Sequence, residues 1–210
     1  MPNPGNFYAM LFRMKDINRW GLMYNTKHET LAEHSMQCAL LAHALAEIGI
    51  HKFQKSYSAE RICTAALLHD MSEILTGDLP TPVKYHNDEI RCAYKKIEKA
   101  AEERLLAALE ADFRADYESL ISLPEEERSV VKAADKLCAY IKCLQEESRG
   151  NPEFDSAKKT LAKALDECVL CELKYFMEHY LDAFSKNLDE ISLSLPICVD
   201  TDTTKSEVTT

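Results

Sequence analysis

Apolar residues recur at helical spacing along most of this chain, and few residues interrupt the pattern. The side chains of His34, Cys38, Leu41, Leu45 and Ile48 follow one another at steps of three or four, so a helix places them all on one face. The 210 residues include only five glycines and seven prolines, the residues that interrupt helices most strongly. Alternation of apolar and polar residues, which is typical of strands, never extends beyond a few positions. The sequence therefore predicts an all-α fold.

Capping residues and helix breakers divide the chain into predicted elements. Thr30 with Glu33 three residues later has the pattern of a capping box. Pro124 opens a helix as a first-turn proline and is followed by three glutamates, which favour a helix N-terminus. The strongest interruption is segment 76–82, which contains one glycine and two prolines. The predicted helices span about residues 6–13, 30–48, 58–74, 87–109, 111–121, 124–148 and 154–188, the last with a candidate break near 179–182.

The length and composition predict one domain. A chain of 210 residues can build a sizeable core, which we expect over residues 1–191. Residues 192–210 are mostly polar and acidic, and their composition predicts a disordered C-terminal tail.

The net charge and the apolar runs exclude several classes of partner. A net charge of −10 argues against a surface that binds a nucleic-acid polymer, since such a surface is basic. No apolar run reaches the length of a membrane span, and the first residues lack the apolar stretch of a signal peptide. The eight cysteines are scattered over predicted helices and are expected to be reduced. These features favour a cytoplasmic enzyme without a membrane partner.

Four side chains form a candidate metal site within the helical sequence. His34 lies on the apolar face of its helix, His69 and Asp70 are adjacent, and Asp135 borders the apolar stripe of the helix after Pro124. Imidazoles with carboxylates suit a divalent transition metal, whereas a structural zinc site would favour thiolates. Each residue alone also has a simpler interpretation, a hydrogen-bonded core histidine or an aspartate paired with a lysine. Three helices that each offer an inward ligand favour the metal.

The segments around these residues resemble a known family of hydrolases. The His…His-Asp…Asp set has the signature of the HD-domain phosphohydrolases, and the wider segments are similar to the YfbR-type 5′-deoxynucleotidases. The resemblance extends over about residues 7–191. Its segments are Ile17-Asn18-Arg19-Trp20, Glu33-His34-Ser35, His69-Asp70, the stretch 72–85 with its Thr-Gly-Asp-Leu-Pro-Thr-Pro core, and Lys132-x-Ala134-Asp135.

This resemblance implies a fold, a reaction and a set of partners. It implies an HD-domain helical bundle that forms homodimers and hydrolyses deoxyribonucleoside 5′-monophosphates to deoxynucleoside and phosphate. Ribonucleotides and 3′-monophosphates are expected to be poor substrates. The implied cofactor is one divalent metal ion, with Co²⁺, Mn²⁺ or Cu²⁺ favoured and Zn²⁺ also compatible.

The resemblance also implies a role for each site residue. The metal ligands are His34, His69, Asp70 and Asp135, of which the two aspartates are also expected to contact substrate. The catalytic residues are Glu73, Arg19 and Asp70. The remaining substrate-binding residues are Arg19 on the phosphate, Trp20 beside the sugar, where it excludes a 2′-hydroxyl, and Asp78, Leu79, Pro80 and Thr81 around the nucleoside.

The chemistry of the residues agrees with this hypothesis but leaves alternatives open. Glu73 follows His69 by one helical turn, where it can move a proton to or from the reacting oxygen, although it could also be a surface glutamate paired with a lysine. Arg19 suits a bidentate phosphate contact, although a surface ion pair is equally compatible with the sequence. Trp20 can pack on sugar or base, in the core, or at an interface.

Two further functions are compatible with the same residues. One is an HD-domain hydrolase of another nucleotide phosphoester, and the other is a catalytically dead nucleotide-binding module. Substrates with more phosphates need several clustered cations, whereas this neighbourhood offers Arg19, Lys84 and Lys27. A dead module is expected to have lost a ligand or Glu73, and all are present.

Overall fold

The computed structural model describes residues 3, 5–84 and 86–195, and helices are the only extended regular elements among them. The predicted all-α class is confirmed. The one β contact in these residues is an isolated antiparallel bridge between Asn18 and Thr30. In chain order the elements are α1 (Gly5–Leu11), η1 (Phe12–Asp16), α2 (Leu31–Phe53), α3 (Ala59–Leu68), α4 (Glu73–Thr76), α5 (Thr81–Lys84), α6 (Asp88–Leu106), α7 (Ala111–Ile121), α8 (Glu125–Ser148), η2 (Pro152–Phe154), α9 (Asp155–Asp166), α10 (Cys171–His179), η3 (Leu181–Ser185) and α11 (Leu188–Ser194).

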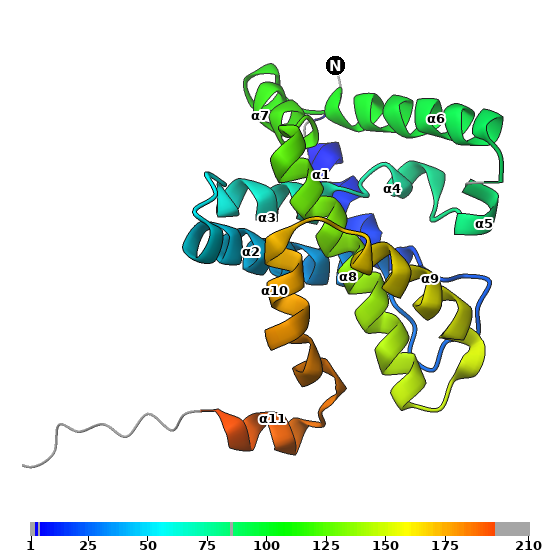
Figure 1. The fold of residues 1–210 in the computed structure, drawn as a ribbon. Coiled ribbons are helices and arrows are strands. Elements are labelled where there is room, and N and C mark those ends of the chain that lie inside the picture. Colours follow the sequence, from blue (N-terminus) through cyan, green and yellow to red (C-terminus); the bar gives the residue numbers. More distant parts are fainter. Residues whose placement is uncertain (1–2, 4, 85, 196–210) are drawn as a thin grey trace, which may run out of the picture.

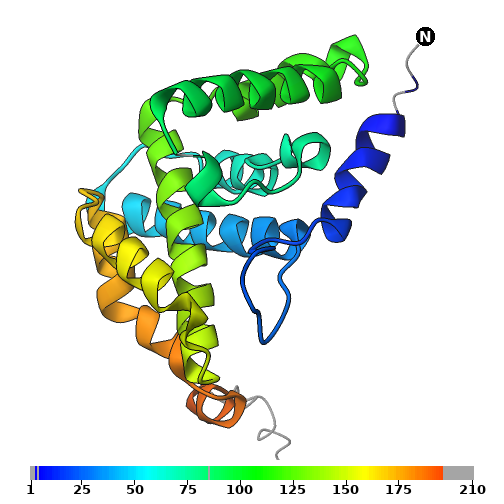
Figure 2. The same cartoon turned by 90° about the vertical axis from the view of Figure 1, so that its right-hand side faces the viewer.

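Helix α8 is the central element of the fold (Figure 1). It contacts α2 and α3 on one side and α9 on another. Its apolar stripe, which includes Val130, Ala134, Leu137 and Ile141, lies in the main core with the inward residues of α2 and α3. A second buried cluster joins α1, α3 and α6 through Phe7, Leu68 and Leu105. Figure 2 shows α6 crossing above α2 and α3, and the loop 17–30 lying beside α2.

The predicted capping box begins α2. The hydroxyl of Thr30 accepts a hydrogen bond from the backbone N–H of Glu33, and the Glu33 carboxylate accepts one from the backbone N–H of Thr30. Both bonds satisfy donors that a helix N-terminus otherwise leaves free. They fix the first turn of α2, which carries His34.

The predicted helix over residues 58–74 is wrong in one respect, since α3 ends at Leu68. The Nδ1 proton of His69 is donated to the Ala66 carbonyl at 2.6 Å, and the backbone then continues through contacts three residues apart, such as Glu73 N to Asp70 O at 2.9 Å. Such tight turns replace the regular helix. His69 and Asp70 therefore lie in a turn, and Glu73 begins the short helix α4.

The predicted helix over residues 154–188 is also wrong. A turn after Asp166 separates α9 from α10, and η3 follows α10. Leu165 on α9 and Leu173 on α10 are both buried in the main core, so both helices pack on it after the change of direction at residues 167–170. The candidate break at 179–182 does coincide with the end of α10.

The C-terminal helix extends past the expected domain boundary, and the described cysteines form no disulfides. Helix α11 crosses the expected boundary at residue 192, and residues 196–210 lie outside the described part, so the disordered tail stays a prediction. The seven cysteines between residues 38 and 171 are all free thiols. Among the described helices, none combines the length and apolar character that crossing a bilayer requires.

Gly49 lies inside α2, whereas the sequence predicts the helix to stop there. A Cβ atom at this position would lie 2.6 Å from Cε2 of Tyr57, whose hydroxyl is fixed by donation to Glu172 at 2.8 Å. The glycine therefore serves close packing in mid-helix, and the helix continues to Phe53.

We expect Gly49→Ala to lower the free energy of unfolding by about 1–2 kcal/mol, because the clash with a fixed ring outweighs the gain in helix propensity. Urea denaturation measures this change. The control is Gly21→Ala, where the added Cβ meets nothing within 4 Å and stability should hardly change. A Gly49→Ala protein more stable than the wild type would contradict the account.

Candidate metal centre

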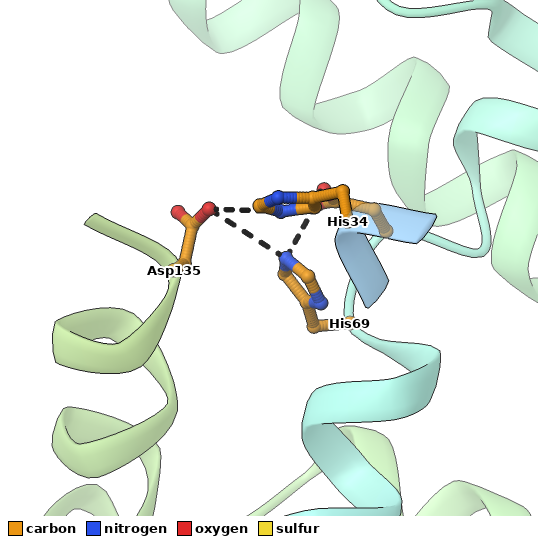
Figure 3. A group of neighbouring side chains, drawn as sticks. His34, His69 and Asp135 are labelled. Carbon is orange, nitrogen blue, oxygen red and sulfur yellow. Dashed lines mark ion pairs between the residues drawn. The ribbon is translucent and has the colours of Figure 1, made fainter. Parts of the chain in front are cut away.

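Three separate elements bring the four predicted ligands together. His34 comes from the first turn of α2, His69 from the turn after α3, and Asp135 from the middle of α8 (Figure 3). Asp70 follows His69 in the same turn. One ligand atom from each lies within 4.8 Å of the other three. Asp135 Oδ1 is 3.2 Å from His34 Nε2 and 3.8 Å from His69 Nε2. Asp70 Oδ2 is 3.1 Å from His69 Nε2 and 3.7 Å from His34 Nε2.

The histidine nitrogens in this cluster fit a bound cation. His34 is fully buried, and neither its two ring nitrogens nor Nε2 of His69 has a hydrogen-bond partner among the described residues. Such orphaned nitrogens are costly in a protein interior. Because His69 donates its Nδ1 proton to Ala66, its other ring nitrogen, Nε2, faces the cluster, as is common in histidines that bind metals. Two imidazoles and two carboxylates form a donor set that suits a divalent transition metal.

The charges in the cluster are strongly coupled. Burial opposes the charged form of His69, but Asp70 and Asp135 outweigh burial and raise its pKa well above the usual value. Burial likewise favours a neutral Asp135, but the His34 and His69 imidazoles hold the pKa of that carboxyl well below its usual range. A negative pair of carboxylates therefore attracts positive charge to this point, whether a proton on histidine or a metal cation.

Arg19 lies directly against one of these ligands. Its Nη1 is 3.2 Å from Asp70 Oδ2, and its Nε is 3.5 Å from Glu29 Oε2. Only 12% of the Arg19 side chain is exposed. Burial works against its charge, but Asp70, Asp135 and Glu29 outweigh that cost and raise the pKa of Arg19. The guanidinium is thus a permanent cation at the edge of the metal cluster.

Trp20 is held in an unusual backbone conformation beside Arg19. Its φ is 59°, in the left-handed region, which non-glycine residues adopt at a cost of roughly 1–3 kcal/mol. Its backbone N–H donates to Asp78 Oδ2 at 3.3 Å, and its indole Nε1–H donates to Glu29 Oε2 at 2.8 Å. The ring packs edge-on against Phe154 with centroids 5.2 Å apart. These contacts hold the strained residue in place and bring Asp78 into the site.

A buried polar network anchors the far end of the loop that carries Trp20. Glu146 of α8, which is fully buried, accepts hydrogen bonds from Thr26 N at 2.9 Å, Thr26 Oγ1 at 2.7 Å and Asn151 Nδ2 at 2.8 Å. Lys142 pairs with the same carboxylate and donates to the Lys27 carbonyl at 2.6 Å. The buried charge is therefore compensated, and the loop is tied to the helix that carries Asp135.

Glu73 is a buried carboxyl next to the cluster rather than a surface residue. Its relative exposure is 3%, and Oε2 has no hydrogen-bond partner among the described residues. Burial raises its pKa to about 8, with Asp70 and Asp78 adding to the rise. Lys84 Nζ lies 3.6 Å from Glu73 Oε1 and 2.8 Å from Glu98 Oε1, so this cation is shared between two carboxylates.

The remaining predicted substrate residues follow Asp78 in the link between α4 and α5. Leu79 and Pro80 are half-buried, and the Pro80 carbonyl accepts hydrogen bonds from the N–H groups of Val83 and Lys84. Thr81 begins α5, and its side chain lies outside the described part. Their contacts with a nucleoside stay a prediction.

A cavity adjoins the cluster. It has a volume of about 240 Å³, and its wall includes His69 and Asp135. The other lining residues are mostly apolar and come from α3, α7 and α8, with Glu102, Arg128 and Lys132 adding charge. The cluster is therefore reachable from a partly enclosed space.

Sequence reasoning did not single out Glu29 or Glu146. Glu29 is buried and contacts both Arg19 and Trp20, yet its sequence position shows only a glutamate in an irregular stretch. The pairing of Asn18 with Thr30, which places it there, has no signal in the apolar pattern. Glu146 looks like one of several glutamates near a helix end.

The fold defines a class of protein. An HD-domain phosphohydrolase from Listeria innocua is structurally similar with a TM-score of 0.76, 21% sequence identity, and coverage of 86% of this chain and 88% of that one. The HD phosphohydrolase DatZ of cyanophage S-2L, solved with dA and one catalytic Zn²⁺ ion, matches with a TM-score of 0.57, 22% identity, and coverage of 83% and 96%. The all-α fold of this chain is thus that of HD-domain phosphohydrolases.

Sequence comparison narrows the class to a family. The family described as 5′-deoxynucleotidase YfbR-like matches residues 6–184. A 5′-deoxynucleotidase of Photorhabdus temperata is 50% identical over 194 residues, covering 91% of this chain and 98% of its own, and one of Pectobacterium atrosepticum is 48% identical over 198 residues, covering 93% and 100%. The chain belongs to the 5′-deoxynucleotidase YfbR-like family. The predicted resemblance and its implied enzyme class are confirmed.

The raised pKa of Glu73 predicts a pH dependence of stability in metal-stripped protein. Between pH 4.5 and about 8 the folded state binds a proton at Glu73 that the unfolded state has released, so the free energy of unfolding falls as pH rises. In Glu73→Gln this part of the decline should vanish, and the variant should gain on the order of a few kcal/mol at pH 8. Urea denaturation at several pH values measures the free energy of unfolding. Plots of this free energy against pH that run parallel for the two proteins would contradict the raised pKa of Glu73.

Proposed function

We propose that this chain hydrolyses deoxyribonucleoside 5′-monophosphates to deoxynucleoside and phosphate with one divalent metal ion. The observation that carries the proposal is the convergence of His34, His69, Asp70 and Asp135 within 4.8 Å, with Arg19 on Asp70. Membership of the family and the names of its relatives support the same activity. The metal identity is open, with Co²⁺, Mn²⁺, Cu²⁺ and Zn²⁺ all compatible with the donors.

The residues of the site can perform each part of this reaction. A bound divalent ion polarises the phosphate and lowers the pKa of water, and His34, His69, Asp70 and Asp135 are the residues that would hold it. Arg19 would hold the phosphate in line for attack, since its planar guanidinium matches two phosphate oxygens. Glu73 would move the proton, and its raised pKa favours donation to the leaving 5′-oxygen.

The choice between deoxyribose and ribose would come from the residues around the nucleoside. Trp20 would pack beside the sugar, and Asp78, Leu79, Pro80 and Thr81 would surround the nucleoside. An apolar wall rejects an added hydroxyl only about 100-fold, so we expect a strong preference for deoxyribonucleotides rather than complete exclusion of ribonucleotides. A 3′-monophosphate would carry its phosphate on a different carbon of the sugar, away from Arg19, so we expect it to be a poor substrate.

The distribution of cations favours a monophosphate over substrates with more phosphates. Arg19 is the buried cation that contacts the cluster, whereas Lys84 is already shared between Glu73 and Glu98. Arg128 and Lys132 of the adjoining cavity both pair with Glu125. Lys27 is largely exposed. The presence of every ligand and of the buried Glu73 argues against a dead module. A homodimer, which the family resemblance implies, and the cytoplasmic location expected from the sequence complete the proposal.

Phosphate release from dAMP and AMP by metal-stripped protein, with and without Co²⁺ or Mn²⁺, tests the function. We expect metal-dependent release from dAMP, weaker release from AMP, and a loss of at least about 100-fold in Glu73→Ala, which removes the proton-transfer group. Glu103→Ala, on the exposed surface of α6, is the control and should keep full activity. Tight metal binding without release from either nucleotide would overturn the deoxynucleotidase assignment in favour of another phosphoester.

A further inference from the structure

Glu29 connects two substrate-facing residues that would otherwise be independent. Its side chain is buried, with 6% relative exposure. The same oxygen, Oε2, lies 2.8 Å from Nε1 of Trp20 and 3.5 Å from Nε of Arg19. A second group of ligand-type atoms places a Glu29 oxygen within 4.8 Å of a ring nitrogen of His34. The Glu29 carboxylate therefore lies next to Arg19, Trp20 and His34, the residues proposed to bind the phosphate, the sugar and the metal.

The backbone fixes Glu29 at this point. Arg19 N donates to the Glu29 carbonyl at 2.9 Å, and Leu31 N donates to the Ile17 carbonyl at 2.8 Å. These bonds close the base of the loop between η1 and α2, which is visible beside α2 in Figure 2. Because α2 begins two residues later, the position of Glu29 is set by a rigid helix rather than by the loop itself.

The strained conformation of Trp20 requires contacts that restrain it, and Glu29 provides one of them. Its left-handed φ of 59° is not a conformation that a tryptophan adopts without restraint. The Asp78 contact restrains the backbone, and the Phe154 contact restrains one edge of the ring. The indole N–H has Glu29 as its acceptor, so this bond sets the rotation of the ring about its side-chain torsions.

We propose that Glu29 is a positioning residue that holds the Trp20 indole and the Arg19 guanidinium in one arrangement and thereby sets the preference for a 2′-deoxyribose over a ribose monophosphate. The inference rests on the proposed function for the identity of the substrate. Its structural part, that the hydrogen bond to Glu29 sets the rotation of the indole, does not depend on the reaction.

Two substitutions at Glu29 separate its two contacts. Glu29→Gln keeps an oxygen that accepts from the indole N–H but removes the charge beside Arg19. Glu29→Leu removes both. Trp20→Phe removes the same hydrogen bond from the other partner and serves if Glu29→Leu does not fold. The matched control is Glu172→Gln, another buried glutamate that accepts one hydrogen bond, from Tyr57, in the packing of α10 against α2.

The first readout is the ratio of kcat/KM for dAMP to kcat/KM for AMP in the metal-loaded enzyme. We expect the ratio to fall about tenfold in Glu29→Leu and Trp20→Phe, since a freed ring no longer rejects the added hydroxyl. It should stay within about twofold of wild type in Glu29→Gln and Glu172→Gln. In the double variant Glu29→Leu/Trp20→Phe the two losses should not add, because both remove one interaction.

The second readout is tryptophan fluorescence, which needs neither metal nor substrate. Trp20 is the only tryptophan in the chain, so the emission reports this residue alone. We expect a red shift and lower anisotropy in Glu29→Leu, and neither in Glu29→Gln or Glu172→Gln.

The two readouts distinguish failure of the inference from failure of the proposed function. If wild-type protein releases no phosphate from dAMP, the function fails, and unchanged emission in Glu29→Leu then overturns the positioning role as well. If wild type is active and Glu29→Leu keeps both the wild-type ratio and the wild-type emission, the inference is overturned while the function stands. A lower ratio together with a red-shifted emission supports it.

Discussion

The approach of α2 to α8 is the constraint on which the rest of this structure depends. Their apolar faces pack in the main core, and that packing brings Nε2 of His34 to 3.2 Å from Oδ1 of Asp135. Hydrophobic burial thereby offsets the cost of placing a buried imidazole and a carboxylate at this point. The turn after α3 then contributes His69 and Asp70, and the cluster gains a donor set of the kind that suits a divalent cation.

The substrate side of the site is built on the same frame by polar contacts. Arg19 and Trp20 lie in a loop with little apolar surface in the core, so they need other restraints. Glu29 and Asp78 restrain them near the cluster, and Glu146 restrains the far end of the loop on α8. Each of these carboxyl groups is buried or half-buried, and each is matched by N–H or cationic donors, which is the condition for such groups to stabilise a unique arrangement.

Sequence patterns predicted those features that depend on local rules. The steps of three and four residues placed His34 on the buried face of α2, and the capping box at Thr30 set the start of that helix. Helix α3 ends where the His69 side chain donates a hydrogen bond to the Ala66 carbonyl, and the end of α9 depends on tertiary packing. Helical periodicity could not reveal either end. No glycine or proline marks residues 167–170. Glu29 was missed because its role follows from the pairing of Asn18 with Thr30, a contact between segments without an alternating pattern.

Calorimetric titration of metal-stripped protein with Mn²⁺ tests the central claim, that packing of α2 on α8 creates a single metal centre. We predict one ion per chain for wild type, an affinity at least about tenfold lower for Asp135→Ala, and unchanged binding for His43→Ala, an exposed histidine on α2. Asp135 is half-exposed, so its loss leaves the core intact. Equal affinity in wild type and Asp135→Ala, or a stoichiometry other than one, would contradict the account.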